Sequence, residues 1–137
     1  FVKYDAYSNP TKLKSKSGIY TYYVWAYNHQ YPVAKIESSI DANISVTVED
    51  SRLSGSDDLA KIKTDVAYLK GKLSGYIGKK DYMVSYYTYK PLVGMTSETD
   101  PAGHTTYYEY DDFGRLELAR DQDGNIVKKY KYNYAEQ

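Results

Sequence analysis

Residues 105–134 decide the fold of this chain, and their sequence is TTYYEYDDFGRLELARDQDGNIVKKYKYNY. Side chains that favour strands recur here at every second position: Thr106, Tyr108 and Tyr110, then Tyr130, Tyr132 and Tyr134. A period of two places such side chains on one face of a strand. Phe113-Gly114 and Asp123-Gly124-Asn125 lie between the strands, and Gly and Asn tolerate the positive φ that two-residue hairpin turns require. The stretch therefore predicts β-hairpins.

The same pattern returns toward the N-terminus. Equivalent tyrosines are separated by 23, 62, 21 and 22 residues, namely Tyr4, Tyr27, Tyr89, Tyr110 and Tyr132. The period is therefore about 21–23 residues, interrupted once by about 40 extra residues. Each unit predicts a strand, a turn, a second strand and a further turn near Asp-x-x-Gly. We expect a mainly β fold, an antiparallel meander of hairpins.

The extra residues have a different period. Apolar side chains follow one another at steps of 3, 4, 3 and 4 residues in Leu59, Ile62, Val66, Leu69 and Leu73. That spacing predicts one inserted α-helix at about residues 56–74, with Ser56 or Asp57 capping its start and Gly75 at its end. A weaker alternation from Ile40 to Val48, in Ile44, Val46 and Val48, predicts a further strand. We expect a single domain over residues 1–137, with a helix-containing insert at about 38–82.

Composition restricts the function. Tyrosine occurs 19 times against 2 Phe, 1 Trp and 2 Met, which suits half-exposed sheet faces better than a dry interior. The 18 basic and 18 acidic residues balance, so we expect no nucleic-acid partner. No apolar run approaches the roughly 20 residues needed to span a bilayer, so we expect no membrane insertion by this segment. Cysteine is absent, and a start at Phe1 suggests a mature or excised fragment.

Candidate reactive groups are few. The run Asp121 to Asn125 superficially resembles a calcium loop, but Ile126 and Tyr132 stand where an EF-hand needs Gly and Glu. A hairpin turn accounts for it better. His29 and His104 lie beside turns, with no nucleophile motif near either. We expect no catalytic residue, no metal site and no cofactor.

The most aromatic strand face carries Tyr23, Trp25 and Tyr27. Flat aromatic faces can stack on sugar rings as they stack on other apolar planes. Cross-strand packing is the other interpretation, and it is favoured because several similar Tyr-x-Tyr strands stand in line.

The periodic units resemble a known family. Tyr110-Asp111-Asp-Phe-Gly114-Arg115-Leu116 is similar to the YD repeat of RHS/YD-repeat proteins, whose core signature is Tyr-Asp-x-x-Gly-Arg-Leu. Tyr4-Asp5-Ala-Tyr-Ser-Asn9-Pro10 resembles a variant with Asn-Pro in place of Arg-Leu. The copies at Tyr27 and Tyr89 are degenerate. The resemblance covers about residues 1–37 and 83–134, without the helical insert.

The resemblance implies a structural role. Such repeats wind side by side into long sheets, which form shells around cargo in bacterial polymorphic toxins and a barrel in teneurin-like proteins. We expect a non-catalytic segment of a larger RHS/YD-repeat protein, extracellular or at the cell surface, that builds a β-sheet shell or scaffold. Its partners would be neighbouring repeats of the parent chain, with self-association through sheet edges. A carbohydrate-binding module is the alternative, since glycan binding has been attributed to these repeats.

Overall fold

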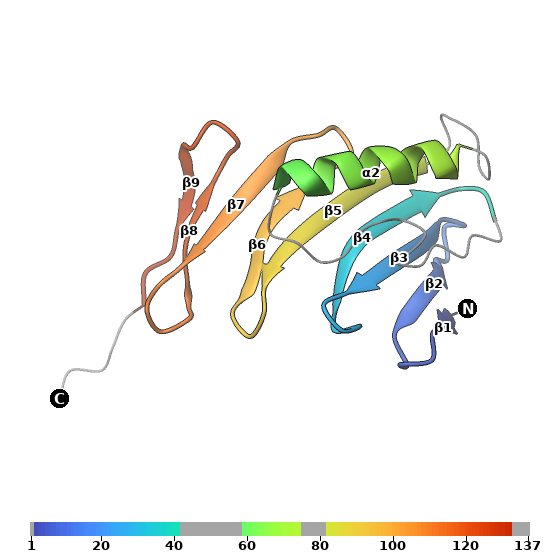
Figure 1. Ribbon diagram of the computed structural model, residues 1–137, viewed down its shortest axis with the longest axis horizontal. Coiled ribbons are helices and arrows are strands. Elements are labelled where there is room, and N and C mark those ends of the chain that lie inside the picture. Colours follow the sequence, from blue (N-terminus) through green and yellow to red (C-terminus); the bar gives the residue numbers. More distant parts are fainter. Residues whose placement is uncertain (1, 42–58, 75–81, 133–137) are drawn as a thin grey trace.

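The computed structural model describes residues 2–41, 59–74 and 82–132, and it shows a single antiparallel sheet with one helix across it (Figure 1). Nine strands follow one another in chain order across the sheet. They are β1 (Val2–Tyr4), β2 (Pro10–Lys14), β3 (Tyr20–Ala26), β4 (Tyr31–Ser38), β5 (Tyr82–Lys90), β6 (Gly94–Thr99), β7 (Thr105–Tyr110), β8 (Leu116–Arg120) and β9 (Ile126–Lys129). The mainly β hairpin meander predicted from the sequence is confirmed.

The insert does not interrupt the sheet. It leaves the sheet after β4 and returns at β5, and these two strands pair directly, from Ala34 opposite Tyr86 to Ser38 opposite Tyr82. Ser38 and Tyr82 are therefore strand residues, so the insert occupies residues 39–81, one residue shorter at each end than predicted. The period of the hairpins continues across it.

The helix α2 (Leu59–Leu73) begins and ends at the first and last residues of the predicted apolar stripe. It ends one residue earlier than predicted, because Ser74 already lies in a turn, and Lys70 and Lys72 occupy its last turn. The Tyr82 hydroxyl donates a hydrogen bond at 2.9 Å to the Lys70 carbonyl, which also accepts from the Ser74 N–H, and so ties the helix end to β5. The predicted start at residues 56–58 and the end signal Gly75 lie outside the described residues. So does the predicted strand Ile40–Val48 from residue 42 onward, while Ile40 lies in a bend after β4.

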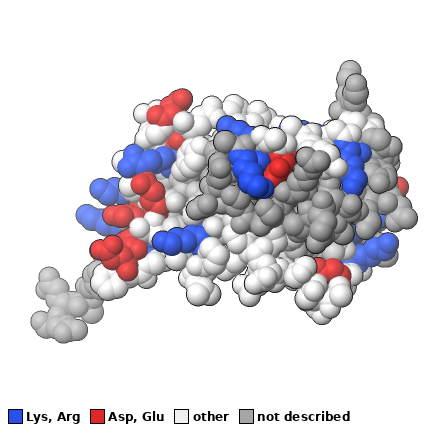
Figure 2. Space-filling view, in the orientation of Figure 1, with Lys and Arg blue, Asp and Glu red and all other residues white. Residues whose placement is uncertain are grey.

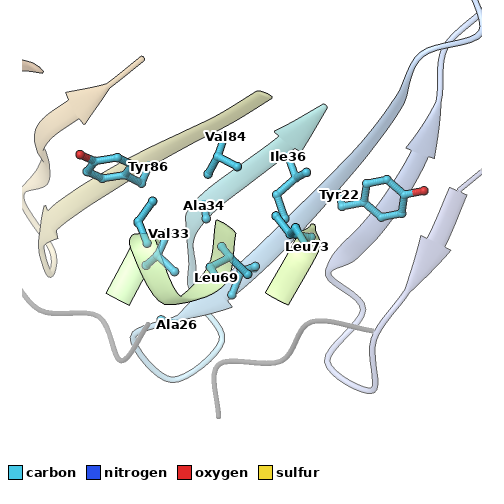
Figure 3. Packing of buried hydrophobic residues seen from close by; sticks show 11 residues of the cluster. Tyr22, Ala26, Val33, Ala34, Ile36, Leu69, Leu73, Val84 and Tyr86 are labelled. Carbon is cyan, nitrogen blue, oxygen red and sulfur yellow. The ribbon is translucent and has the colours of Figure 1, made fainter. Parts of the chain in front are cut away.

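The core lies between α2 and the middle of the sheet (Figure 3). Leu69 and Leu73 of the helix are completely buried against Val33, Ala34 and Ile36 of β4. Burial of one such large aliphatic side chain contributes about 1.5–3 kcal/mol. Val24, Val84 and the tyrosines Tyr22 and Tyr86 complete this layer. The apolar cluster of the described residues therefore lies where the helix covers the sheet.

Strand β5 is buried on both of its faces. Val84 and Tyr86 belong to the core under the helix, while Ser85, Tyr87 and Tyr89 are buried on the other face. Burial is the main cause that raises the pKa of the Tyr87 and Tyr89 hydroxyls. At the end of the sheet, by contrast, all four residues of β9 are exposed. The central strands thus hold most of the packing.

Candidate functional site

Five turns of the sheet share one geometry. In each, the N–H of the first residue donates to the carbonyl of the fifth, and the N–H of the fourth donates back to the carbonyl of the first. These turns span residues 5–9, 15–19, 100–104, 111–115 and 121–125. The fourth residue always has positive φ, between 64° and 90°, in Ser8, Gly18, Gly103, Gly114 and Gly124. This is a three-residue hairpin loop, a type I turn followed by a left-handed residue. The predicted two-residue turns are wrong at these positions.

Aspartate recurs as the first residue of these turns because its side chain accepts hydrogen bonds from the turn backbone. Asp111 Oδ1 accepts hydrogen bonds from the backbone N–H groups of Phe113 and Arg115, both at 2.9 Å. Asp5 and Asp121 accept from the third and fifth residues of their own turns in the same way. A short side chain with an acceptor oxygen is suited to this local task. The Asp-x-x-Gly pattern therefore stabilises the turn.

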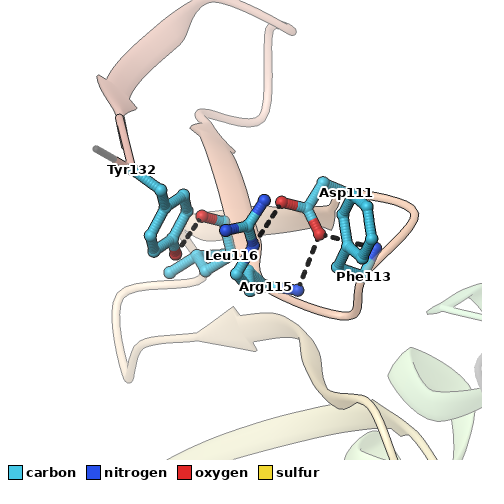
Figure 4. A network of polar contacts seen from close by, with 5 residues as sticks. All are labelled: Asp111, Phe113, Arg115, Leu116 and Tyr132. Carbon is cyan, nitrogen blue, oxygen red and sulfur yellow. Dashed lines mark hydrogen bonds and ion pairs between the residues drawn. The ribbon is translucent and has the colours of Figure 1, made fainter. Parts of the chain in front are cut away.

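The Arg115 side chain connects this turn to the segment that follows β9 (Figure 4). Its Nε donates to Asp111 Oδ2 at 2.9 Å. Its guanidinium lies 5.1 Å from the ring centre of Phe113 and 4.5 Å from that of Tyr132, within the range of cation–π attraction. The Tyr132 hydroxyl in turn donates to the Leu116 carbonyl at 2.6 Å. The residues of the Tyr-Asp-x-x-Gly-Arg-Leu motif thus connect one hairpin to the following one.

The same connection occurs three times, and we call these contacts the aromatic bridges. Each is a hydrogen bond from an aromatic side chain to a carbonyl of the preceding strand: Trp25 to Pro10 at 2.8 Å, Tyr110 to Met95 at 2.7 Å and Tyr132 to Leu116 at 2.6 Å. Every acceptor lies just after a turn, and every donor lies near the end of an odd-numbered strand: Trp25 is next to last in β3, Tyr110 ends β7, and Tyr132 follows β9 by three residues. The sequence reasoning missed these bridges. Their signal is the nearly equal separation of 15, 15 and 16 residues between donor and acceptor.

Gly94 makes room for one bridge. A Cβ at this position would lie 2.5 Å from the Tyr110 hydroxyl oxygen, and its φ of 151° is unfavourable for other residues. Because the Tyr110 hydroxyl is held by the Met95 carbonyl, it cannot give way without loss of that hydrogen bond. Gly94 is therefore fixed by the neighbouring hairpin, a role that the sequence reasoning did not assign to it.

The bridges lie along one border of the sheet, which we call the tyrosine border. It consists of the turns after β1, β3, β5 and β7 (residues 5–9, 27–30, 91–93 and 111–115) with the adjoining strand ends. The five tyrosines that define the sequence period all lie on it: Tyr4, Tyr27, Tyr89, Tyr110 and Tyr132. The opposite border carries the turns at 15–19, 100–104 and 121–125 together with the insert.

Other contacts connect the turns of the tyrosine border. The Tyr7 and His29 rings stack at 3.7 Å, and the Asn9 side-chain amide donates to the His29 carbonyl at 2.6 Å. Farther along, the Tyr27 ring meets Tyr89 edge to face at 5.7 Å, and its hydroxyl accepts from the Tyr89 N–H at 3.1 Å. Neighbouring turns are thus held to one another by side chains.

The structure also gives the positions of the other residues that the sequence singled out. Tyr4 ends β1 with its side chain 63% exposed, and Gly124 is the left-handed residue of the β8–β9 turn. The rings of Tyr23 and Trp25 are tilted by 52° at 6.4 Å, and the Trp25 indole donates to Pro10. Tyr27 lies in a turn, edge-on to Tyr89. These three rings are therefore not coplanar.

Among residues 2–41, 59–74 and 82–132, no three His, Asp or Glu side chains gather as metal ligands would. The part of the chain that the structure describes also has no helix long and apolar enough to cross a membrane.

The turn aspartates predict how stability depends on pH. Three turn aspartates, Asp100, Asp111 and Asp121, have a pKa below the ordinary 3.8. The largest cause in each case is a hydrogen bond from the backbone N–H of the fifth turn residue, which is His104, Arg115 or Asn125 respectively. A lowered folded-state pKa contributes stability above the unfolded pKa, and this stability is lost as pH falls through the folded value. We expect the urea midpoint to be steady from neutral pH to about 5 and to fall below about pH 4.

The control for this prediction replaces the three carboxylates by amides. The triple variant Asp100→Asn, Asp111→Asn and Asp121→Asn keeps an acceptor oxygen in each turn but cannot titrate. Its midpoint should fall less between pH 5 and pH 3 than that of the unaltered protein. Equal acid dependence in the two proteins would show that other groups control the transition.

Residues 94–126 match the RHS Repeat family. The matched stretch covers β6, β7, β8 and the first residue of β9, and it includes three Asp-x-x-Gly turns and the Tyr110 bridge. No curated protein matches the chain.

Proposed function

We propose that this chain, whose residues 94–126 match the RHS Repeat family, is a non-catalytic structural segment of a longer RHS/YD-repeat protein. In this role it builds an extended β-sheet that serves as a shell wall or surface scaffold. The aromatic bridges carry the proposal. They run between hairpins, so each unit supplies the contact that positions the next one, as expected of a repeat that propagates by stacking on its neighbours.

The edge strands support growth of the sheet. Every residue of β1 and β9 is exposed, and the outer backbone groups of an edge strand can pair with a further strand. Tyr4 occupies the position that Tyr110 has three units later, and no hydrogen bond from its hydroxyl exists within the described residues. A further hairpin beside β1 would offer it the carbonyl that Met95 offers to Tyr110. The partners are therefore neighbouring repeats.

A structural role also accounts for the polar groups. The carboxylates of Asp5, Asp111 and Asp121 are occupied by backbone N–H groups of their own turns. His29 is stacked on Tyr7 and lies far from any nucleophile motif. By the family resemblance, we place the parent protein outside the cell or at its surface.

Glycan binding receives less support. A sugar ring stacks best on a flat aromatic face, whereas Tyr23 and Trp25 are tilted and Tyr27 is edge-on to Tyr89. Unchanged glycan-array signals after Trp25→Ala, or no signals at all, would remove this function.

The proposal is tested by adding a unit. Because Tyr89 and Tyr110 are equivalent, a second copy of residues 90–110 can follow Tyr110 without disturbing either junction. It adds two strands, so the direction of every later strand is preserved. We expect a folded protein whose unfolding m-value in urea is larger, since the m-value grows with the surface exposed on unfolding.

A half-unit insertion is the matched control. A second copy of residues 90–99 adds one strand and reverses the direction of all strands after it, so it should destabilise the protein strongly. If the full unit is tolerated no better than the half unit, the sheet does not propagate by whole hairpins and the proposal fails.

A further inference from the structure

The two borders of the sheet differ in what their turns expose. On the tyrosine border three of the four turns have an apolar tip, with Tyr7, Leu92 and Phe113 being 62%, 95% and 81% exposed. The β3–β4 turn instead exposes Asn28 and His29. On the opposite border the corresponding tips are Ser17, Ala102 and Asp123. In Figure 2 the lower border is largely white at the β3–β4 and β5–β6 turns, while charged side chains gather at the β8–β9 end. Exposed apolar groups that recur along one line usually mark an interaction surface.

Backbone strain is concentrated on the same border. All positive-φ residues other than glycine in the described chain lie there: Ser8, Tyr27, Asn28, His29 and Leu92. On the opposite border each positive-φ residue is a glycine, at 18, 103 and 124. Leu92 follows Pro91 in a turn closed by the Val93 N–H and the Lys90 carbonyl, a position where glycine or asparagine is preferred. Strain of this kind persists where a surface is shaped for a task.

The tyrosine border is also rigid. The aromatic bridges, the Tyr7–His29 stack and the Tyr27–Tyr89 contact hold its turns together, and the Leu92 N–H donates to the Tyr31 hydroxyl at 3.3 Å. A row of apolar tips that is already ordered loses little entropy when it binds. Exposure, strain and rigidity therefore coincide on one border of the molecule.

We propose that the tyrosine border docks against the tyrosine border of a second copy of this chain. Successive tips along this border are two strands apart, which is about 9.6 Å at the usual strand spacing. The tips of a second copy have the same spacing. A two-fold axis through the middle of the border would bring Tyr7 toward Phe113 of the partner copy, and His29 toward Leu92. Association then occurs across the strand ends, perpendicular to the growth through β1 and β9.

A twisted surface favours a copy over a lipid bilayer. Neighbouring strands turn by roughly 20–25°, so the turns along one border of a sheet do not lie in a plane. A flat membrane could meet only some of the tips at once. A second sheet with the same twist and period can meet them all.

The size of the border sets the expected affinity. Nine strands at about 4.8 Å make it about 40 Å long, and a sheet is about 10 Å thick, which gives about 400 Å² per partner. This is half of the roughly 800 Å² that each partner contributes to a standard stable interface. The association is therefore weak and shows at high protein concentration.

Sedimentation velocity over a concentration series tests the proposal, with Leu92→Asp as the main variant. Aspartate tolerates positive φ better than leucine does, so the melting temperature of the variant should equal or exceed that of the unaltered protein. The charge at the tip should nevertheless lower the association constant by roughly tenfold or more. Ala102→Asp places the same charge on a tip of the opposite border and should leave the association constant unchanged.

Three outcomes would overturn the proposal. The unaltered chain could remain monomeric at millimolar concentration. Association could survive Leu92→Asp, which would assign it to the edge strands β1 and β9. The protein could also pellet with phosphatidylcholine vesicles while showing no self-association, which would make a lipid surface the partner of the tips.

Discussion

Replacement of Leu69 by alanine is expected to lower the free energy of unfolding by about 2–5 kcal/mol. Leu69 is completely buried where α2 meets β4, so its truncation removes apolar contacts and leaves a cavity between the two layers. The helix is the only described element on that face of the sheet. Urea denaturation followed by circular dichroism measures the change.

Lys63→Ala is the matched control for this core prediction. Lys63 lies on the exposed side of the same helix, and alanine has a similar helix propensity, so its effect should stay within about 0.5 kcal/mol. If the two variants unfold at the same urea concentration, α2 does not pack on the sheet as the structure shows.

Gly94→Ala is expected to cost about 2–4 kcal/mol, although the change adds a single methyl group. The new Cβ would lie 2.5 Å from the Tyr110 hydroxyl oxygen, and alanine would be strained at φ 151°. Gly71→Ala is an informative comparison because nothing lies within 4 Å of its added Cβ and Gly71 is inside a helix. That substitution should stabilise the protein by up to about 1 kcal/mol.

A double-mutant cycle separates strain from collision at Gly94. Tyr110→Phe alone removes the hydrogen bond to Met95 and should cost about 1 kcal/mol. In the Tyr110→Phe background the hydroxyl is gone, so Gly94→Ala should cost less than in the unaltered protein. Additive costs would mean that Tyr110 does not contact Gly94.

The local features of the fold could be predicted from the sequence because local chemistry determines them. Alternating tyrosines specify strands, Asp-x-x-Gly specifies a turn, and the spacing from Leu59 to Leu73 specifies a helix. The five periodic tyrosines do share one border, as equivalent positions of a repeat should. The type of turn was missed because aspartate, glycine and asparagine suit several hairpin loops, and only the hydrogen-bond pattern distinguishes them.

The contacts between hairpins could not be predicted, because they depend on which strands become neighbours. Nothing local to Gly94 shows that a hydroxyl from residue 110 will occupy the space beside it. Trp25 looked like part of a stacking face, whereas its indole donates to a carbonyl of the adjacent strand. The burial of β5 on both faces likewise results from its central place in the sheet.

The central claim is that the hairpins form one continuous sheet across the helical insert, and engineered cysteine pairs test it most directly. The chain has no cysteine of its own, so an introduced pair has no competing thiols. Lys35 on β4 lies opposite Ser85 on β5, and their Cβ atoms should be about 4.5–5.5 Å apart. Glu98 lies on β6, two strands from Lys35 and about 10 Å away.

The account predicts that Lys35→Cys with Ser85→Cys forms a disulfide under mild oxidation, while Lys35→Cys with Glu98→Cys remains reduced. Mass spectrometry of the folded protein distinguishes the two states. Cross-linking of the second pair, or failure of the first in a protein that still folds, would show that β4 and β5 are not neighbours and would contradict the continuous sheet.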